Sequence, residues 1–139
     1  MSFNIKTRAL FDTTIIHLVD PETEMEMYED DAQTKPLTIE VYGRSSSQYR
    51  KWLDGATRKA DKERKANKGV DKLKTTDESI EDSADMLAAI SINAANWDYA
   101  GEPVASKEAF RKVYADPSLM WIGEQVAKKL GDMSAFLPK

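Results

Sequence analysis

Turn and capping residues divide the last third of the chain, residues 97–137, into short segments. Gly101-Glu102-Pro103 is a turn signal, and Ser106 precedes a short apolar-periodic run. Asp116-Pro117 combines a helix N-cap with a proline at the first helical position, and Gly131 follows the last apolar stripe as a helix-ending residue. This third of the chain is therefore expected to hold two short helices, joined by tight turns.

Two further helices are predicted upstream. The first begins at Ser45-Ser46-Ser47-Gln48, which fits a capping box. One face of this helix is apolar; it consists of Tyr49, Trp52, Leu53, Ala56 and Ala60. Residues 61–74 are nearly all polar, so this helix either frays or projects into solvent there. The second helix begins with a capping box at Thr75-Thr76-Asp77-Glu78, extends to Ala95, and is apolar enough to form the core.

Strand patterns lie near the N-terminus. Residues 13–19 are rich in β-branched side chains, and residues 37–43 alternate apolar and polar side chains. Residues 24–28 fit either a short strand or a loop. The sequence thus predicts a mainly helical α+β chain: a small antiparallel hairpin or three-stranded meander in residues 1–44, then a four-helix bundle in residues 45–139. We expect one compact domain with a flexible basic stretch at about residues 61–74.

Charged residues are segregated into blocks. Residues 20–31 hold seven acids and no base, residues 50–74 hold ten of the twenty Lys and Arg residues, and residues 75–102 hold seven acids and no base. Solvated faces are the commonest explanation of such blocks. The alternative is that the basic block docks against an acidic one, in the same chain or in a neighbouring copy.

The chain offers little basis for catalysis or for metal binding. It has no cysteine and one histidine, His17, which lies in a strand-like run without metal-ligand spacing. The acids of residues 24–31 lack the spacing of a calcium loop, and no phosphate loop or nucleophile elbow is present. We expect no enzyme activity, no catalytic residue, no metal site and no cofactor. The N-terminus shows no signal-peptide pattern, and no apolar run is long enough to span a membrane.

Large apolar residues are in surplus near the C-terminus. A helix cannot bury three consecutive large side chains against one neighbour, and exposed aromatic or methionine side chains suit contacts with a partner helix. The predicted partner-binding residues are Trp97, Tyr99, Leu119, Met120, Trp121, Phe136 and Leu137. For Met120 and Trp121 the alternative is burial in the core.

The basic stretch is the best candidate for contact with nucleic acid. Residues 58–74 supply clustered cations, which phosphate binding requires. They lack interleaved aromatic residues for base stacking, and the formal net charge of the chain is −4. Nucleic-acid binding is therefore the minority interpretation.

Several segments together resemble one protein family. They are residues 37–43, Ser46-Ser47-Gln48-Tyr49-Arg50, Trp97, Gly101-Glu102-Pro103-Val104, Ser106, Tyr114-Ala115-Asp116-Pro117, Ile122, Glu124-Gln125-Val126, Gly131-Asp132 and Phe136-Leu137. In their order and spacing they are similar to the tail assembly chaperones of long-tailed bacteriophages. The link Asp98-Tyr99-Ala100 is shorter than the polar turn that this family often carries.

The resemblance implies a role without catalysis. Such chaperones bind the long helical tape measure protein and keep it soluble while tail-tube subunits polymerise around it. They work in the host cytoplasm and are absent from the mature virion. The chain looks like a short form, and a frameshift-extended form would recruit the major tail tube protein; a homo-oligomer is also expected. The alternatives are a structural tail or neck component that stays in the virion, and a small nucleic-acid-binding regulator.

Overall fold

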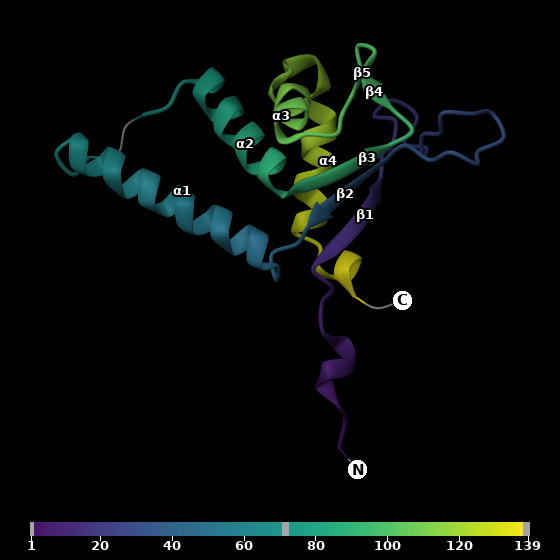
Figure 1. The fold of residues 1–139 in the computed structure, drawn as a ribbon, viewed down its shortest axis with the longest axis horizontal. Helices are drawn as coiled ribbons and strands as arrows, with labels where there is room; N and C mark the ends of the chain where they lie inside the picture. The colour runs from purple at the N-terminus through teal and green to yellow at the C-terminus, as the bar shows by residue number, and fades with distance from the viewer. Residues whose placement is uncertain (1, 71–72, 138–139) are drawn as a thin grey trace.

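The computed structural model describes residues 2–70 and 73–137, and its fold combines a small sheet with four α-helices (Figure 1). The strands are β1 (Thr13–His17), β2 (Thr38–Tyr42), β3 (Ser91–Ala95), β4 (Asp98–Tyr99) and β5 (Glu102–Pro103). The helices are α1 (Ser47–Ala66), α2 (Thr76–Ile90), α3 (Lys107–Ala115) and α4 (Met120–Leu130). Three short 3-10 turns are η1 (Ile5–Arg8), η2 (Pro117–Leu119) and η3 (Met133–Phe136).

The main sheet is antiparallel, with the order β1-β2-β3, and β4 and β5 pair as a separate two-stranded antiparallel sheet. Ile16 on β1 pairs with Ile39 on β2, and both are buried, as is Val41. Ile15, which points to the other face, is exposed. One face of the sheet therefore carries the core, as the alternation of side chains along β2 predicts.

Helices α2, α3 and α4 close this core. Their buried side chains include Leu87 and Ile90 of α2, Phe110 of α3 and Val126 of α4, and Phe136 of η3 completes the cluster. Helix α1 contributes no buried residue. The predicted α+β class is confirmed, whereas the predicted four-helix bundle is not, because α1 lies outside the packed core (Figure 1).

The prediction that the second helix extends to Ala95 is wrong. Helix α2 ends at Ile90, and Ser91 adopts an extended conformation at which β3 begins. Thr38 of β2 pairs with Ala95, and Glu40 pairs with Asn93. The third strand therefore comes from the middle of the chain, and the sheet is not purely N-terminal. Residues 24–28, the other candidate strand, form only isolated bridges in a loop.

Most predicted helix starts are confirmed. Thr75 and Glu78 form the capping box of α2, and Ser106 caps α3. The predicted start of the last helix at Asp116-Pro117 is wrong: Asp116 caps the short turn η2 through the amide of Ser118, and α4 begins only at Met120, without a side-chain cap. The start of α1 differs by one residue. Its N-cap is Ser46, whose buried hydroxyl accepts from the Tyr49 amide at 3.1 Å and donates to the Gly43 carbonyl at 2.7 Å.

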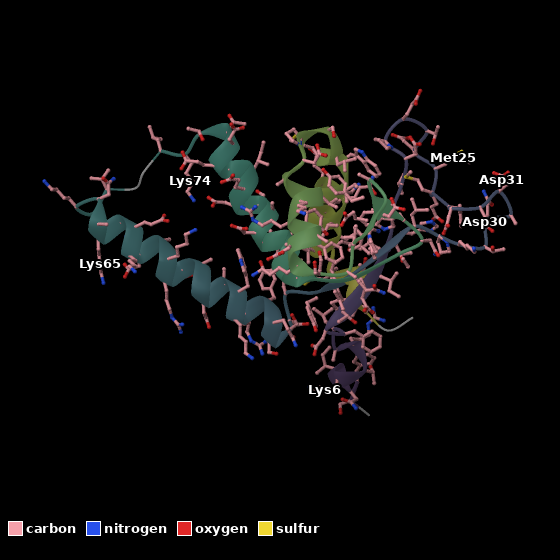
Figure 2. The ribbon with its side chains drawn as sticks, turned by 45° about the horizontal axis from the view of Figure 1, so that its top comes forward. Lys6, Met25, Asp30, Asp31, Lys65 and Lys74 are labelled. Atoms are coloured by element: carbon pink, nitrogen blue, oxygen red, sulfur yellow. The ribbon has the colours of Figure 1, made fainter. Side chains whose placement is uncertain are left out.

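Helix α1 projects from the body of the molecule (Figure 1). It remains helical to Ala66, beyond the end of its apolar stripe, and Asp61 and Lys65 form an i,i+4 ion pair of 3.0 Å on it. Of the two predicted alternatives, fraying or projecting into solvent as a helix, residues 61–66 adopt the second. Residues 71–72 of the predicted flexible stretch lie outside the described residues. Figure 2 shows Lys65 near the far end of α1, and Asp30 and Asp31 on a loop at the opposite end of the molecule.

Candidate partner-binding groove

Helix α1 is amphipathic but lacks a packing partner along most of its length. None of its 20 residues is buried, although Tyr49, Trp52 and Ala56 are half-buried on one face. Leu53 at the edge of this face is 45% exposed. Most stability of a helix in a protein comes from packing of its apolar face. An apolar face left open in this way is typical of a helix that packs against a partner.

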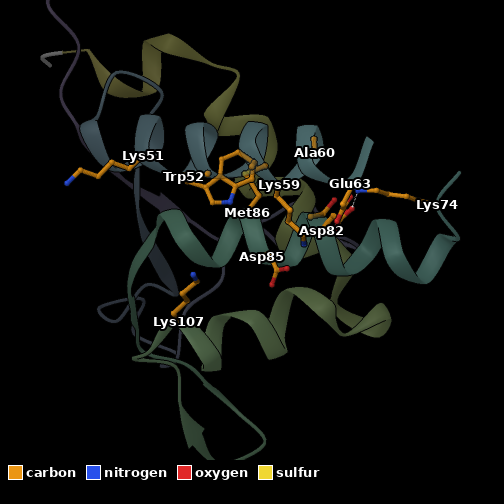
Figure 3. A pocket seen from close by; sticks show the side chains of 13 residues that line it. Lys51, Trp52, Lys59, Ala60, Glu63, Lys74, Asp82, Asp85, Met86 and Lys107 are labelled. Atoms are coloured by element: carbon orange, nitrogen blue, oxygen red, sulfur yellow. Dashed lines mark hydrogen bonds and ion pairs between the residues drawn. The ribbon is translucent and has the colours of Figure 1, made fainter. Parts of the chain in front are cut away.

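The apolar face of α1 is one wall of a groove, and α2 is the other wall. This α1/α2 groove has a volume of about 700 Å³. Figure 3 shows Trp52 from α1 and Met86 from α2 next to each other inside it. The α1 wall consists of Lys51, Trp52, Gly55, Ala56, Lys59, Ala60 and Glu63, and the opposite side consists of Lys74, Asp82, Ser83, Asp85, Met86 and Lys107. The groove thus has an apolar centre and a charged rim.

The groove continues toward the free end of α1 as a polar hollow. This second space of about 470 Å³ is also lined by both helices, and Lys59, Glu81 and Asp82 are among its residues. The surface between α1 and α2 therefore changes from apolar near the sheet to charged near the tips of the helices. An amphipathic helix whose apolar residues are concentrated at one end matches this gradient.

Ion pairs hold two acids of the α2 side of the groove, Asp82 and Asp85. Lys74, in the link between the helices, binds Asp82 of α2, and this hydrogen bond raises the pKa of the lysine. Arg111 of α3 contacts Asp85 at 2.5 Å, and that hydrogen bond raises the pKa of the guanidinium group. These pairs are partly exposed, so their contribution to stability is small. Their main effect is to orient the carboxylates at the rim of the groove.

Three of the predicted partner-binding residues are engaged within the fold. Trp97 donates from its indole nitrogen to the Thr38 carbonyl at 2.9 Å, and Tyr99 donates from its hydroxyl to Asp116 at 2.8 Å. Phe136 is only 3% exposed and belongs to the core. Their positions are explained by packing, without a partner.

The other four predicted residues lie around α4 and the C-terminal turn. Met120, in the first turn of α4, is 49% exposed. Leu119, Trp121 and Leu137 are half-buried, and the first two pack against the core. The structure does not gather the seven predicted residues into one surface, and Met120 is the most accessible of them.

His17 contacts the loop that carries the acids of residues 20–31. The His17 ring nitrogens lie 2.8 Å from the Met27 carbonyl and 2.9 Å from a Glu26 carboxylate oxygen. Asp30 binds Thr34 and the Lys35 amide, and the hydrogen bond from Thr34 contributes most to lowering its pKa. Within residues 2–70 and 73–137, no group of three or more His, Asp or Glu side chains is arranged to hold a metal ion.

The sequence does not predict the groove. The apolar stripe of α1 is visible in the sequence, but the stripe alone does not say that α2 diverges from it. Met86 gives no separate signal, because it lies among the apolar residues of a helix whose other face is the core. The open space depends on the angle between the two helices. This angle is set at the sheet, where α1 begins after β2 and α2 ends before β3.

Comparison with other proteins identifies no relative: no model of a protein family, no curated protein and no solved structure matches this chain. Among the described residues, no helix has both the length and the apolar character needed to cross a membrane.

Proposed function

We propose that this protein is a bacteriophage tail assembly chaperone that binds and solubilises the tape measure protein during assembly of the tail tube. The observation that carries this proposal is the α1/α2 groove, because an amphipathic helix with no buried residue borders an open space with an apolar centre. A helical client would lay its apolar stripe against Trp52 and Met86 and keep its charged face at the rim. The client would thereby be prevented from aggregating.

Co-expression with the tape measure protein of the same phage tests this proposal. The tape measure protein should be insoluble alone, and should become soluble and co-purify when the chaperone is present. Recovery of soluble tape measure protein without the chaperone, or a failure of the two proteins to co-purify, would overturn the proposal.

Two variants locate the binding surface. Trp52→Glu places a charge in the centre of the groove on a helix that contributes nothing to the buried core. Met120→Glu places a charge on α4, outside the groove, at the most exposed of the predicted partner-binding residues. The proposal expects Trp52→Glu to lose the client and Met120→Glu to retain it; the reverse result would place the client on α4.

The alternative function is that of a structural component of the tail or neck, which would use the same groove to bind its partner. Both kinds of protein bind partners through apolar faces, and they differ in whether they leave the particle. Mass spectrometry of purified virions separates them: a chaperone is absent from the virion, and a structural component is present in it.

A nucleic-acid-binding regulator draws on a different surface. The C-terminal half of α1 holds exposed cations, including Arg58, Lys62 and Lys65, which would contact phosphates. An electrophoretic shift assay at low salt tests this alternative, and an absence of binding there removes it.

A further inference from the structure

Strand β1 lies at the edge of the main sheet and pairs only with β2. Its hydrogen bonds to that side come from even-numbered positions, and the Leu18 amide, for example, donates to the Leu37 carbonyl at 2.9 Å. Backbone groups alternate in direction along an antiparallel strand. The N–H and C=O groups of three odd-numbered residues therefore point away from the sheet: Thr13, Ile15 and His17.

Other parts of the chain close this edge on either side of β1. Before the strand, the Phe11 amide donates to the Phe136 carbonyl of η3 at 2.7 Å. After the strand, the side-chain amide of Gln125 on α4 accepts from the Val19 amide at 2.9 Å and donates to the Val19 carbonyl at 2.6 Å. Between these contacts, residues 2–70 and 73–137 supply no hydrogen-bond partner for the outward groups of β1. The edge is thus open along β1 and closed beyond it.

The open part of the edge is accessible from outside. Ile15, at its centre, is 65% exposed on the face of the sheet that points away from the core. An open edge with an exposed apolar residue is a template for pairing with another chain, and proteins usually protect such edges with charges, proline or a covering element. Here the contacts of Phe11 and Gln125 stop short of Ile15.

The acidic loop, residues 20–31, supplies negative charge at one end of this edge. It follows β1 in the chain and extends beyond the C-terminal end of the strand (Figure 1). Within the part of the chain that the structure describes, four of its acids are exposed and form no ion pair: Glu22, Glu24, Glu29 and Asp31. A segment that pairs with β1 and continues past Val19 approaches these carboxylates, which favour cations on it.

We propose that the open edge of β1 binds an extended segment of another protein, which adds a fourth strand to the three-stranded sheet. The outward backbone groups specify an extended backbone, and Ile15 specifies an apolar side chain beside it. The acidic loop specifies cations at one end. If the segment runs antiparallel to β1, its cations precede its paired residues.

A second copy of this chain fits the edge less well than a single strand does. Gln125 of α4 and Phe136 of η3 reach the edge just beyond the two ends of β1. A second copy that offered the same edge would bring its own α4 and η3 against these groups, whereas a lone extended segment adds no such bulk. Strand β1 takes no part in the α1/α2 groove, so a partner on the edge leaves the groove open to a client.

A synthetic peptide tests the pairing. In it Val and Thr alternate after two N-terminal lysines, and both termini are blocked. Titrated into the full chain, it should shift the NMR signals of the Thr13, Ile15 and His17 amides saturably and slow their hydrogen exchange, because these amides gain carbonyl partners. The same peptide with N-methyl groups on the amides that face β1 should bind about tenfold more weakly or worse. Glutamates in place of the lysines should also weaken binding, most strongly at low salt.

Two variants of Ile15 separate the backbone from the side chain. Ile15→Pro removes one outward N–H and leaves the hydrogen bonds to β2 in place, since proline is tolerated where the N–H of an edge strand faces solvent. It should weaken the lysine peptide about tenfold or more. Ile15→Thr is the matched control, because it keeps the N–H and the β-branched shape, and it should weaken binding less. The N-methylated peptide makes the same comparison on the unchanged chain.

Three results would overturn the proposal. The first is that the lysine peptide does not bind, or shifts only signals of other elements. The second is that Ile15→Pro and N-methylation leave its affinity unchanged. The third is that the Ile15 amide becomes protected as the concentration of the chain alone is raised, because a second copy would then occupy the edge.

Discussion

The hydroxyl groups of Ser91 and Tyr114 lie 2.7 Å apart and join α3 to the residue at which α2 becomes β3. The same Ser91 hydroxyl also lies 2.7 Å from the Leu87 carbonyl, to which it donates. Ser91 therefore ends the helix and anchors the new strand at once. This junction fixes the direction of α2, and with it one wall of the α1/α2 groove.

Loss of the Tyr114 hydroxyl should destabilise the fold modestly. Tyr114→Phe removes the bond to Ser91 but leaves the Ser91 bond to Leu87, so we expect a loss of about 1 kcal/mol in the free energy of unfolding. Urea denaturation followed by circular dichroism measures this loss. An unchanged midpoint would mean that the junction does not depend on this bond.

Tyr114 should also make the protein sensitive to alkali. Burial raises the pKa of Tyr114 from 10.0 to about 12, while its bond to Ser91 opposes the rise. The unfolded chain therefore loses this proton first, and stability falls as the pH rises from 10 toward 12. The loss from this group should reach roughly 2 kcal/mol at the upper end. Tyr114→Phe should show a shallower decline; equal slopes for both proteins would contradict the assignment.

Gly43 cannot carry a side chain without moving Phe136. A Cβ atom there would lie 2.6 Å from the Cε1 atom of the Phe136 ring. Gly43→Ala should therefore cost about 1–3 kcal/mol, measured as a lower thermal midpoint. Gly55→Ala is the matched control, because nothing lies within 4 Å of its Cβ position and alanine favours the helix. A loss of stability in both variants would point to a cause other than the ring.

The buried N-cap of α1, Ser46, should contribute measurably to stability. Ser46→Ala removes both hydrogen bonds of a fully buried hydroxyl, one to the Gly43 carbonyl and one from the Tyr49 amide. We expect a loss of about 1–2 kcal/mol and fraying of the first turn of α1. Ser47→Ala, at an exposed neighbouring position, should leave stability nearly unchanged. Proteolysis within α1 would report the fraying, and equal resistance of the two variants would contradict it.

The local signals in the sequence predict most of this fold. Strands at residues 13–19 and 37–43, and the caps at Thr75 and Ser106, are confirmed because each is set by side chains within a few positions. Asp116 caps the turn η2 and not α4. The strand β3 could not be predicted in this way. Ser91 and the residues up to Ala95 continue the periodicity of α2, and the pairing with β2 that overrides it joins residues about fifty positions apart.

The candidate site was predictable only in part. The apolar stripe of α1 is a local pattern, and the sequence also shows the basic and acidic blocks that border the groove. The sequence predicts Trp97 and Phe136 as partner-binding residues, and the groups that they contact instead, the Thr38 carbonyl and the core, lie too far away in the sequence to be recognised there. A surplus of large apolar residues cannot be divided into core and surface until the packing is known.

Hydrogen exchange of the α1 amides tests the central claim, that the α1/α2 groove receives a helical client. The full chain is measured alone and again with a helical fragment of the tape measure protein. The account predicts that protection of α1 and of the Met86 region of α2 rises on binding, while the first turn of α4 is unchanged. Unchanged exchange in α1, with new protection around Met120, would contradict it.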